Sequence, residues 1–186
     1  MGRLIYGAIA SLDGYIEDRD GGFGWAMPDA ELHAYVNEME RAVGTCLYGR
    51  RMYETMRFWE EGGDGPDDPP EMHEYAAIWR DADKVVYSRT LEAVTTTRTR
   101  LEREFDPEAV RALKAGTERD LSIGGAELAG AALAAGLVDE VNLFLHPVAV
   151  GGGKAALSVA ARLDLELLAE RPFGSGVVHL RYRPRG

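Results

Sequence analysis

Three places in the chain combine glycine, arginine and serine in the way that a phosphate site requires. They are Gly49-Arg50-Arg51, Ser88-Arg89 and Gly124-Gly125. Glycine lets the backbone approach a pyrophosphate closely, and the arginine guanidinium offers forked donors that match phosphate oxygens. Taken singly, a glycine pair is more often a tight turn, and an arginine pair is more often a solvated helix start. The three together predict a nucleotide phosphate site assembled from several loops.

Each motif comes at the end of a short apolar segment that is typical of a buried strand. The segments are 45–48, 83–88 and 121–123, and a helical pattern follows the first and the third. In open α/β sheets, ligands bind beyond the carboxyl ends of the strands, and free N–H groups at helix starts favour anions. We therefore expect all three motifs at one edge of a parallel sheet.

The rest of the chain alternates between strand and helix patterns, which predicts one α/β domain over residues 1–186. Its sheet is mostly parallel, and the last two strands form an antiparallel pair. We expect Pro147 to put the end of the strand before it at a sheet edge or a bulge, and residues 17–24 to form a mobile loop. The remaining expected elements are strands near 3–10, 94–101, 138–146, 163–170 and 176–183 and helices from Pro28 to Gly44 and over 72–80, 107–115 and 126–135.

Composition and charge narrow the range of partners and compartments. The net charge is −10, and residues 1–93 carry 9 cationic against 19 acidic side chains. Such a chain repels nucleic acids and anionic membranes, so the expected partner is a small molecule. No apolar run approaches the roughly 18 residues of a membrane span. A single cysteine, Cys46, excludes a disulfide framework, and the expected location is the reducing cytoplasm.

Searches for other chemical motifs are negative. Residues 148–155 do not form a P-loop, because Val148 and Ala155 stand where glycine and Ser/Thr are needed. Neither the Gly-x-Gly-x-x-Gly dinucleotide fingerprint nor a Gly-x-Ser-x-Gly nucleophile elbow occurs. The four histidines have no ligand spacing, so the sequence predicts no metal site.

Longer stretches around these motifs resemble one family. They are the turn Ser11-Leu12-Asp13-Gly14, the segments Gly49–Glu54 and Val86–Leu91, and the run from Gly124 to Gly153. Together they are similar to the RibD C-terminal domain family, the reductase half of the riboflavin-biosynthesis deaminase/reductase, which shares the dihydrofolate reductase fold. The resemblance implies a three-layer α/β fold, NADPH as cofactor and a homodimer. The activity that the resemblance implies is that of 5-amino-6-(5-phosphoribosylamino)uracil reductase.

The resemblance also implies a set of cofactor contacts. The main chain of Ala8 and Ile9 would hold the nicotinamide carboxamide, and Arg50 would contact the 2′-phosphate. The Gly124–Gly125 peptide bond would be cis, as in dihydrofolate reductases. The full set of implied cofactor residues is Ala8, Ile9, Gly49, Arg50, Arg51, Met52, Ser88, Arg89, Ile123, Gly124, Gly125, Ala126, Glu127 and Leu128.

The substrate side is less sharply defined. Trp25 follows a glycine-rich loop, so it is either a core aromatic or a wall of the substrate pocket, and Tyr53 is a second candidate for substrate binding. Asp13 and Asp29 are the candidate catalytic acids, although each is also typical of a turn or a helix cap. Asp29 follows Pro28 directly, one position earlier than the acid of the dihydrofolate reductase motif. No basic cluster indicates a ribose-phosphate substrate.

Three functions stay open at this point. The first is an NADPH-dependent reductase of a planar pterin-like or pyrimidine-like heterocycle, with residues 17–27 as a lid. The second is an NADP-binding homodimer without turnover, in which strand 138–146 and the tail pair the subunits. The third is an unrelated α/β phosphate-binding module.

Overall fold

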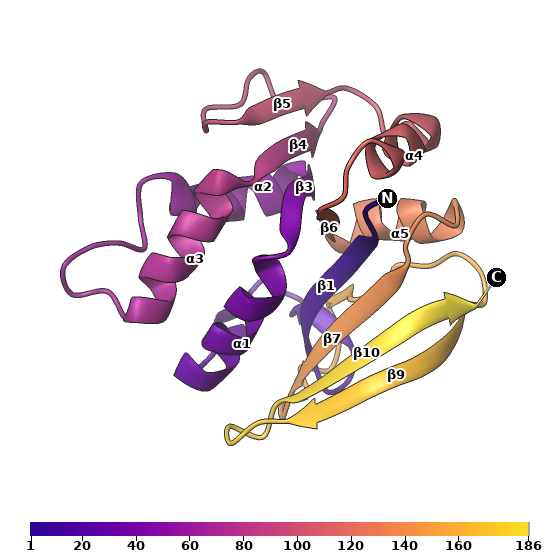
Figure 1. The fold of residues 1–186 in the computed structure, drawn as a ribbon. Helices are drawn as coiled ribbons and strands as arrows, with labels where there is room; N and C mark the ends of the chain where they lie inside the picture. The colour runs from indigo at the N-terminus through magenta and orange to yellow at the C-terminus, as the bar shows by residue number, and fades with distance from the viewer. Residues whose placement is uncertain (186) are drawn as a thin grey trace.

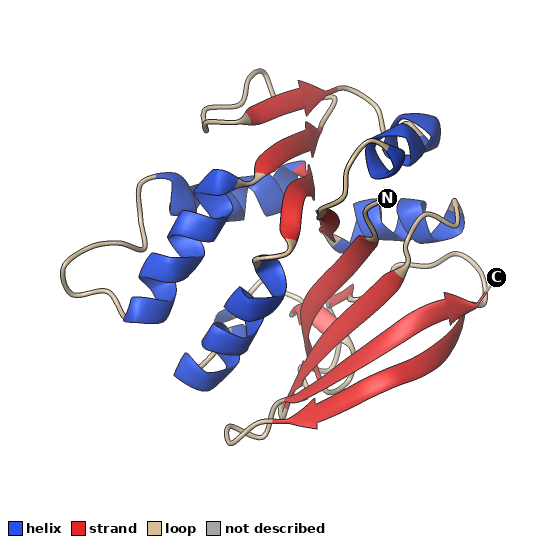
Figure 2. Cartoon of the chain, viewed as in Figure 1, coloured by secondary structure: helices blue, strands red, loops and turns tan. Residues whose placement is uncertain are grey.

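The computed structural model describes residues 1–185, and these form a central eight-stranded sheet with helices on both faces (Figures 1 and 2). The strand order is β5-β4-β3-β6-β1-β7-β10-β9. Neighbours from β5 to β7 are parallel, whereas β10 runs antiparallel to both β7 and β9. The predicted mostly parallel sheet with a C-terminal antiparallel hairpin is therefore confirmed. The strands are β1 (Leu4–Ser11), β2 (Tyr15–Glu17), β3 (Val43–Gly49), β4 (Asp83–Tyr87), β5 (Thr99–Glu102), β6 (Asp120–Gly124), β7 (Glu140–His146), β8 (Lys154–Ala155), β9 (Asp164–Pro172) and β10 (Val178–Arg185).

The predicted helices are present, although the first ends at Glu40 and Gly44 belongs to β3, and two of them begin at side-chain caps. The Asp29 carboxylate accepts the Leu32 N–H at 2.9 Å, and the Asp106 carboxylate accepts the Glu108 N–H at 2.9 Å ahead of Pro107. Both arrangements satisfy backbone donors that a helix start leaves without partners. The helices are α1 (Ala30–Glu40), α2 (Arg50–Met56), α3 (Pro70–Asp81), α4 (Pro107–Ala115) and α5 (Ala126–Ala134), with short 3₁₀ turns η1 (Gly24–Ala26) and η2 (Arg57–Glu60).

Alternating side chains of the strands build a separate core on each face of the sheet. On β3, Leu47 packs into the core under α4 and α5, while Cys46 and Tyr48 pack into the core under α2 and α3. A third cluster lies between α1 and the β7–β10 end of the sheet and contains Leu32 and Phe144. Because a strand presents successive side chains to opposite faces, the near-continuous apolar strands of the sequence are buried on both sides.

A two-stranded sheet joins two loops that the sequence did not pair. Strand β2 runs antiparallel to β8, where the expected mobile loop meets the glycine-rich segment Gly151–Gly153. A Cβ at Gly153 would lie 1.9 Å from the Glu17 carbonyl oxygen, and φ at Gly153 is +140°. The Arg19 guanidinium also donates to the Gly151 carbonyl oxygen at 2.7 Å. This part of the loop is therefore anchored by backbone contacts that need glycine.

The expectation drawn from Pro147 needs correction, and those about location and domain extent stay predictions. Strand β7 lies inside the sheet, between β1 and β10, so the edge expected from Pro147 is wrong; the proline stands one residue beyond the strand, where its missing N–H costs no ladder bond. Each helix within residues 1–185 falls short, in length or in apolar character, of what a membrane span requires. The cytoplasmic location and the single domain over 1–186 stay predictions, and Gly186 lies outside the described residues.

Candidate active site

The three sequence motifs meet at one end of the sheet. In the register of the parallel strands, Tyr48 of β3 pairs with Gly124 of β6, and Gly49 pairs with Tyr87 of β4. The residues that follow these positions are the paired arginines, the serine–arginine step and the second glycine. We call the set Gly49–Met52, Ser88–Arg89 and Gly124–Leu128 the phosphate cradle. Its convergence was predicted from the strand ends alone.

Glycine at the cradle allows helices α2 and α5 to begin close together. A Cβ at Gly124 would lie 2.9 Å from Met52 Cγ, and one at Gly125 would lie 3.7 Å from Met52 Cβ and 4.0 Å from the Gly49 nitrogen. Gly125 has φ +97°, a conformation that other residues rarely adopt, and it is the N-cap of α5. The prediction of a cis bond between Gly124 and Gly125 is wrong, since the structure has no cis peptide bond within residues 1–185.

Arg50 connects the start of α2 to the turn after β4. Its Nη1 donates to Thr90 Oγ1 at 2.9 Å, and its Nε donates to Glu54 Oε1 at 2.8 Å, while the side chain stays 49% exposed. The Ser88 hydroxyl oxygen accepts the Thr90 and Leu91 N–H groups and so shapes the turn. A guanidinium held at a helix start with a free edge toward solvent is suited to bind a phosphate.

A second group of charges lies at the start of α5. Lys154 Nζ of β8 is 3.0 Å from Glu127 Oε1. The pKa of Glu127 is lowered, first by the hydrogen bond and charge of Lys154 and also by the charge of Arg51. Two cations therefore share the region of one carboxylate at a helix N-terminus, which is itself electropositive. This makes a locally basic position in an acidic chain.

The predicted cofactor residues inside and next to the cradle differ in what they expose. Ala8 and Ile9 lie on β1, next to β6, and Ile9 pairs with Phe144 on the other side. The side chains of Ile123 and Ala126 are both buried, at 1% exposure. Of these two, only the main chain is placed to contact a ligand. Arg89 is exposed and lies 3.4 Å from Glu104.

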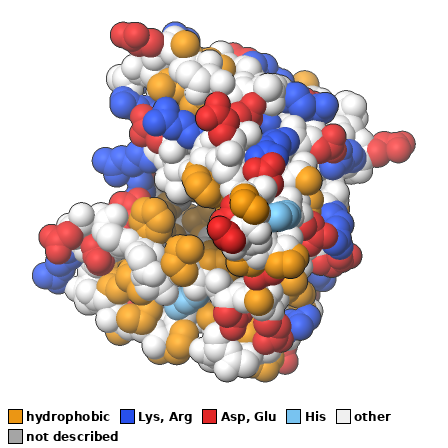
Figure 3. Space-filling model, turned by 90° about the vertical axis from the view of Figure 1, so that its left-hand side faces the viewer, with side chains coloured by type: hydrophobic (Ala, Val, Ile, Leu, Met, Phe, Trp, Pro, Cys, Tyr) orange, Lys and Arg blue, Asp and Glu red, His pale blue; other side chains and the backbone are white. Residues whose placement is uncertain are grey.

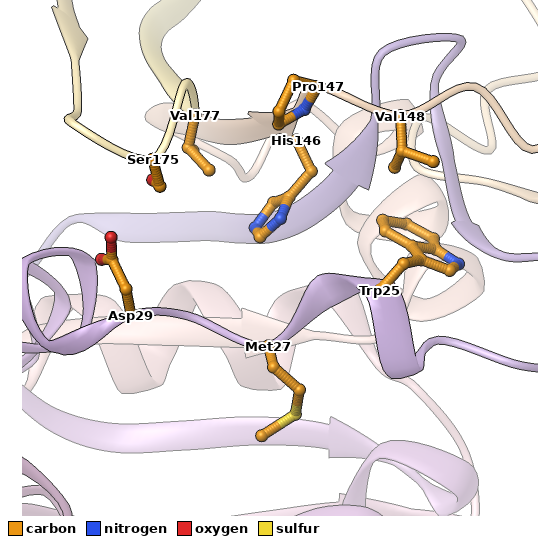
Figure 4. Close-up of a pocket in the computed structure, with 8 residues that line it drawn as sticks. All are labelled: Trp25, Met27, Asp29, His146, Pro147, Val148, Ser175 and Val177. Carbon is orange, nitrogen blue, oxygen red and sulfur yellow. The ribbon is translucent and has the colours of Figure 1, made fainter.

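Beside β1, a small pocket brings together side chains from three distant segments (Figure 4). Its volume is about 210 Å³. In Figure 4 the Asp29 carboxylate points toward Ser175, and the His146 ring hangs between Asp29 and Trp25. We call it the Asp29–His146 pocket. It is lined by Trp25, Met27, Asp29, His146, Pro147, Val148, Ser175 and Val177.

His146 is a pocket residue that the sequence analysis missed. It is 6% exposed, and its Nε2 has no hydrogen-bond partner. Burial lowers the pKa of the ring, against smaller opposing effects of the Trp25 main chain and the Asp29 charge. Burial therefore favours the neutral form of the ring, which meets the Trp25 ring edge-on, with centroids 6.2 Å apart. A histidine that ends a strand just before a proline was the available signal.

The two candidate acids are placed differently. Asp29 is the N-cap of α1 and also lines the pocket. Asp13 does not line it. The Asp13 carboxylate accepts the Ser11 hydroxyl at 2.6 Å and the Val150 and Gly151 N–H groups at 3.1 and 2.8 Å, and these hydrogen bonds, the one from Ser11 first, lower its pKa. Asp13 therefore holds the 150–151 turn, and its position does not support the predicted catalytic role.

The prediction for Tyr53 needs correction. Its side chain is 1% exposed in the core under α2 and α3, and its hydroxyl oxygen accepts the Thr95 N–H at 2.8 Å. It lines neither the Asp29–His146 pocket nor a second, larger cavity of about 530 Å³. The Tyr53 ring is therefore a core contact.

The surface around the helices offers apolar side chains to a ligand. Met27 is 71% exposed and Phe58 is 54% exposed. Figure 3 shows hydrophobic side chains gathered around a hollow on the side of the molecule where α1 and α3 lie, with charged groups of both signs outside them. Exposed apolar patches of this kind often mark binding sites.

Comparison with known proteins identifies the family. The family model described as the RibD C-terminal domain matches residues 3–179. The uncharacterized protein YyaP of Bacillus subtilis (strain 168) is 31% identical over 188 residues, which cover 99% of this chain and 96% of YyaP.

Solved structures show the same fold. A putative riboflavin biosynthesis protein from Shewanella sp. PV-4 aligns with a TM-score of 0.75 at 21% identity, over 99% of both chains. A dihydrofolate reductase from Enterococcus faecalis, complexed with NADP(H), aligns with a TM-score of 0.63 at 14% identity, over 100% of this chain and 98% of that one. The predicted dihydrofolate reductase-like fold is confirmed.

Proposed function

We propose that this chain, which belongs to the RibD C-terminal domain family, is an NADPH-dependent reductase of a small planar heterocycle. Family membership supports a reductase of the riboflavin-pathway type. The single observation that carries the cofactor proposal is the convergence of the three motifs on one end of the sheet. They bring exposed arginines, two adjacent glycines and a helix N-terminus to one place. This local gathering of positive charge stands out in a chain whose net charge is −10.

The residues of the cradle fit a dinucleotide. Arg50, with Thr90 beside it, would hold the 2′-phosphate, and the Gly124–Gly125 turn at the start of α5 would hold the pyrophosphate. The absence of side chains at both glycines leaves the backbone open to close approach. The main chain of Ala8 and Ile9 would orient the nicotinamide. NADPH, when bound, supplies the hydride.

The chain's own part in the chemistry is orientation and exclusion of water. Trp25 belongs to η1, which packs on β1 beside the expected nicotinamide position. The Trp25 indole N–H is buried without a partner, which indicates a polar group of a ligand or a water molecule nearby. Asp29 and His146 offer acceptors on the pocket side of this tryptophan. These groups would bind and orient the heterocycle next to the cofactor.

The test is a cofactor titration followed by turnover. NADPH binding is measured by fluorescence, and NADPH oxidation is then followed with dihydrofolate and a panel of amino-pyrimidines. We expect binding tighter for NADPH than for NADH, and oxidation with at least one heterocycle. Binding of neither dinucleotide would contradict the proposal.

A second candidate, an NADP-binding homodimer without turnover, is favoured by the state of the two acids. One Asp29 oxygen caps α1, and Asp13 is fully used by the 150–151 turn. Tight NADPH binding without oxidation of any panel member would support this second function. The homodimer itself is a proposal in either case, and sedimentation equilibrium with and without NADPH tests it.

A further inference from the structure

We propose that Lys154 is a further cofactor-binding residue, which leaves Glu127 to bind the pyrophosphate of the dinucleotide. Glu127 then holds the Lys154 ammonium group only in the free protein, and it opposes the cofactor instead of contacting it as predicted from the sequence. The inference rests on the proposed NADPH-dependent function and deepens it. It depends on how Lys154 is anchored, on how weakly Glu127 holds it, and on the charges at the start of α5.

The main chain around Lys154 is fixed to β1 and to the loop that follows it. Lys154 pairs with Glu17 across the β2–β8 sheet, and the Ala156 N–H donates to the Gly14 carbonyl oxygen at 2.8 Å. The buried Tyr6 hydroxyl donates to the Ala156 carbonyl oxygen at 2.5 Å. The Lys154 side chain, 22% exposed, therefore reaches α5 from a held segment. A cation that is anchored in this way loses less conformational entropy when it binds an anion.

The contact between Lys154 and Glu127 is easily exchanged. Lys154 Nζ lies 3.0 Å from Glu127 Oε1, but the Glu127 side chain is 80% exposed. A salt bridge to a carboxylate that is mostly in water contributes little to stability, because the solvent competes for the charge. Lys154 can therefore exchange this carboxylate for a phosphate oxygen at low cost.

The charges at the start of α5 match a pyrophosphate only if Glu127 moves away. Lys154 first, through its hydrogen bond and its charge, and then Arg51 lower the pKa of Glu127, so both cations act at this position. Arg51 is exposed and so open to a ligand. The pyrophosphate of a dinucleotide carries one negative charge on each phosphate, which Lys154 and Arg51 would match. The Glu127 carboxylate adds a negative charge that repels such a ligand.

The main chain at the start of α5 offers donors to the same anion. The N-cap of α5 is Gly125, which has no side chain to accept the first N–H groups of the helix. Free N–H groups at a helix start, with the positive end of the helix dipole, attract anions. Because Glu127 belongs to this first turn, the ammonium group that it holds lies beside these donors. Lys154 therefore adds a side-chain cation to an anion position that main chain forms.

The experiment measures dissociation constants for NADPH and NADH by fluorescence titration. Lys154→Gln should weaken both by about 10-fold, because a charged hydrogen bond to the shared pyrophosphate is lost. Lys154→Arg keeps the charge and should stay within about threefold of the parent protein. Glu127→Gln should tighten both by about threefold or more.

Matched controls change exposed charges that lie elsewhere. Arg162→Gln removes a cation whose side chain is 85% exposed, and Glu170→Gln removes an exposed carboxylate of β9. Both controls should stay within about twofold of the parent protein, since they lie outside the phosphate cradle. A gain from Glu170→Gln equal to that from Glu127→Gln would show that only net charge matters and would contradict the inference.

The double variant separates direct contact from neutralisation. If Lys154 only neutralises Glu127, then Lys154→Gln should lose its effect once Glu127→Gln has removed the carboxylate. We expect the opposite, a loss of about 10-fold or more in that background, because Lys154 contacts the cofactor itself. A loss of less than about twofold there, or no gain from Glu127→Gln alone, would overturn the inference.

A competition measurement needs no lysine variant. Inorganic pyrophosphate, which displaces NADPH from the cradle, should bind more tightly to the Glu127→Gln variant than to the parent protein. Equal binding to the two proteins would contradict the opposing role of Glu127. This measurement keeps the inference testable if Lys154→Gln does not fold.

The inference and the proposed function fail in different ways. NADPH binding to the parent protein is measured first, so loss of the cofactor proposal is visible at that step and removes the inference with it. If the parent protein binds NADPH and the variants do not follow the expected pattern, the cofactor proposal stands and the role of Lys154 is wrong.

Discussion

The phosphate cradle and the Asp29–His146 pocket lie on either side of β1 and are built in opposite ways. The cradle consists of main chain, glycines and arginines at the ends of β3, β4 and β6. The pocket consists of single side chains that come from η1–α1, β7 and the β9–β10 turn. One is electropositive and open, and the other contains a carboxylate and an unpartnered neutral imidazole. The difference teaches that substitutions of single side chains would change the pocket far more than the cradle, because main chain forms much of the cradle.

The largest expected effect breaks the cradle alone. Gly125→Val forces a β-branched residue to φ +97° and puts a side chain between α5 and α2. We expect NADPH affinity to fall at least about 100-fold, which is more than about 2.7 kcal/mol. Fluorescence titration measures the loss. Gly116→Ala, at the end of α4 with φ −84° and ordinary contacts, is the control and should bind NADPH normally.

A smaller change separates the two cofactors at the same site. Arg50→Ala removes the guanidinium next to Thr90 and should weaken NADPH binding by about 10-fold to 50-fold, which is about 1.4–2.3 kcal/mol and within the usual range for a charged hydrogen-bonded contact. NADH, which has no 2′-phosphate, should change less than threefold. Equal losses for both cofactors would show that Arg50 supports the helix start rather than the phosphate. Arg162→Ala, on an exposed loop, serves as the control.

Acid should weaken the pocket side of the molecule before the cradle. Burial, with the charges of Arg181 and Arg171, lowers the pKa of His179 to about 4. Its Nε2 is hydrogen-bonded to Asn142 Oδ1 and its Nδ1 to the Tyr35 hydroxyl, and the ring stacks on Phe144. The unfolded chain therefore binds this proton more readily, and the free energy of unfolding falls as pH drops from about 6.5 to about 4.

The His179 contribution should be about 1–3 kcal/mol. Urea unfolding at pH 7 and pH 4.5 measures it, and His179→Gln should flatten this part of the pH dependence. Hydrogen exchange at pH 5 should show faster opening in β7 and β10 than in β3 and β6. Uniform opening of both regions would remove the distinction drawn here.

The smallest expected effect concerns Tyr53, which belongs to neither region. Tyr53→Phe removes the acceptor for the Thr95 N–H, so we expect a loss of about 1 kcal/mol in the free energy of unfolding. Heterocycle and NADPH binding should stay within twofold of the parent protein. A larger change in heterocycle affinity would show that Tyr53 contributes to substrate binding after all.

The sequence predicted the cradle well because its signals are local. Gly49, Arg50 and Gly125 each stand next to an apolar strand pattern, and parallel strands bring their ends together. Most strands and helices were also found, and α4 agrees with its prediction at both ends. Edge strand β5 begins later than expected, at Thr99 instead of Val94, since the turn through Arg98 has φ +51°.

The pocket could be predicted only in part, because no motif holds it together: Trp25 and Asp29 were expected on the substrate side, whereas His146 and Ser175 were not. His146 and Ser175 are distant from Asp29 in sequence. They come close only because the end of β7 and the β9–β10 turn lie next to the start of α1. The pairing of β2 with β8 was missed for the same reason, since two or three residues carry no periodic pattern. Tyr53 was misplaced because the sequence around it carries no signal that separates a core side chain from a pocket side chain.

The close contact at Gly153 affects how mutational screens of this protein should be interpreted. Any side chain there would collide with the Glu17 carbonyl oxygen, 1.9 Å from the Cβ position. In a saturation-mutagenesis screen for activity, substitutions at Gly153 should therefore be as depleted as those at a ligand-binding residue. The steric clash with the Glu17 backbone is sufficient to cause that depletion, so depletion at this position does not by itself identify a ligand contact.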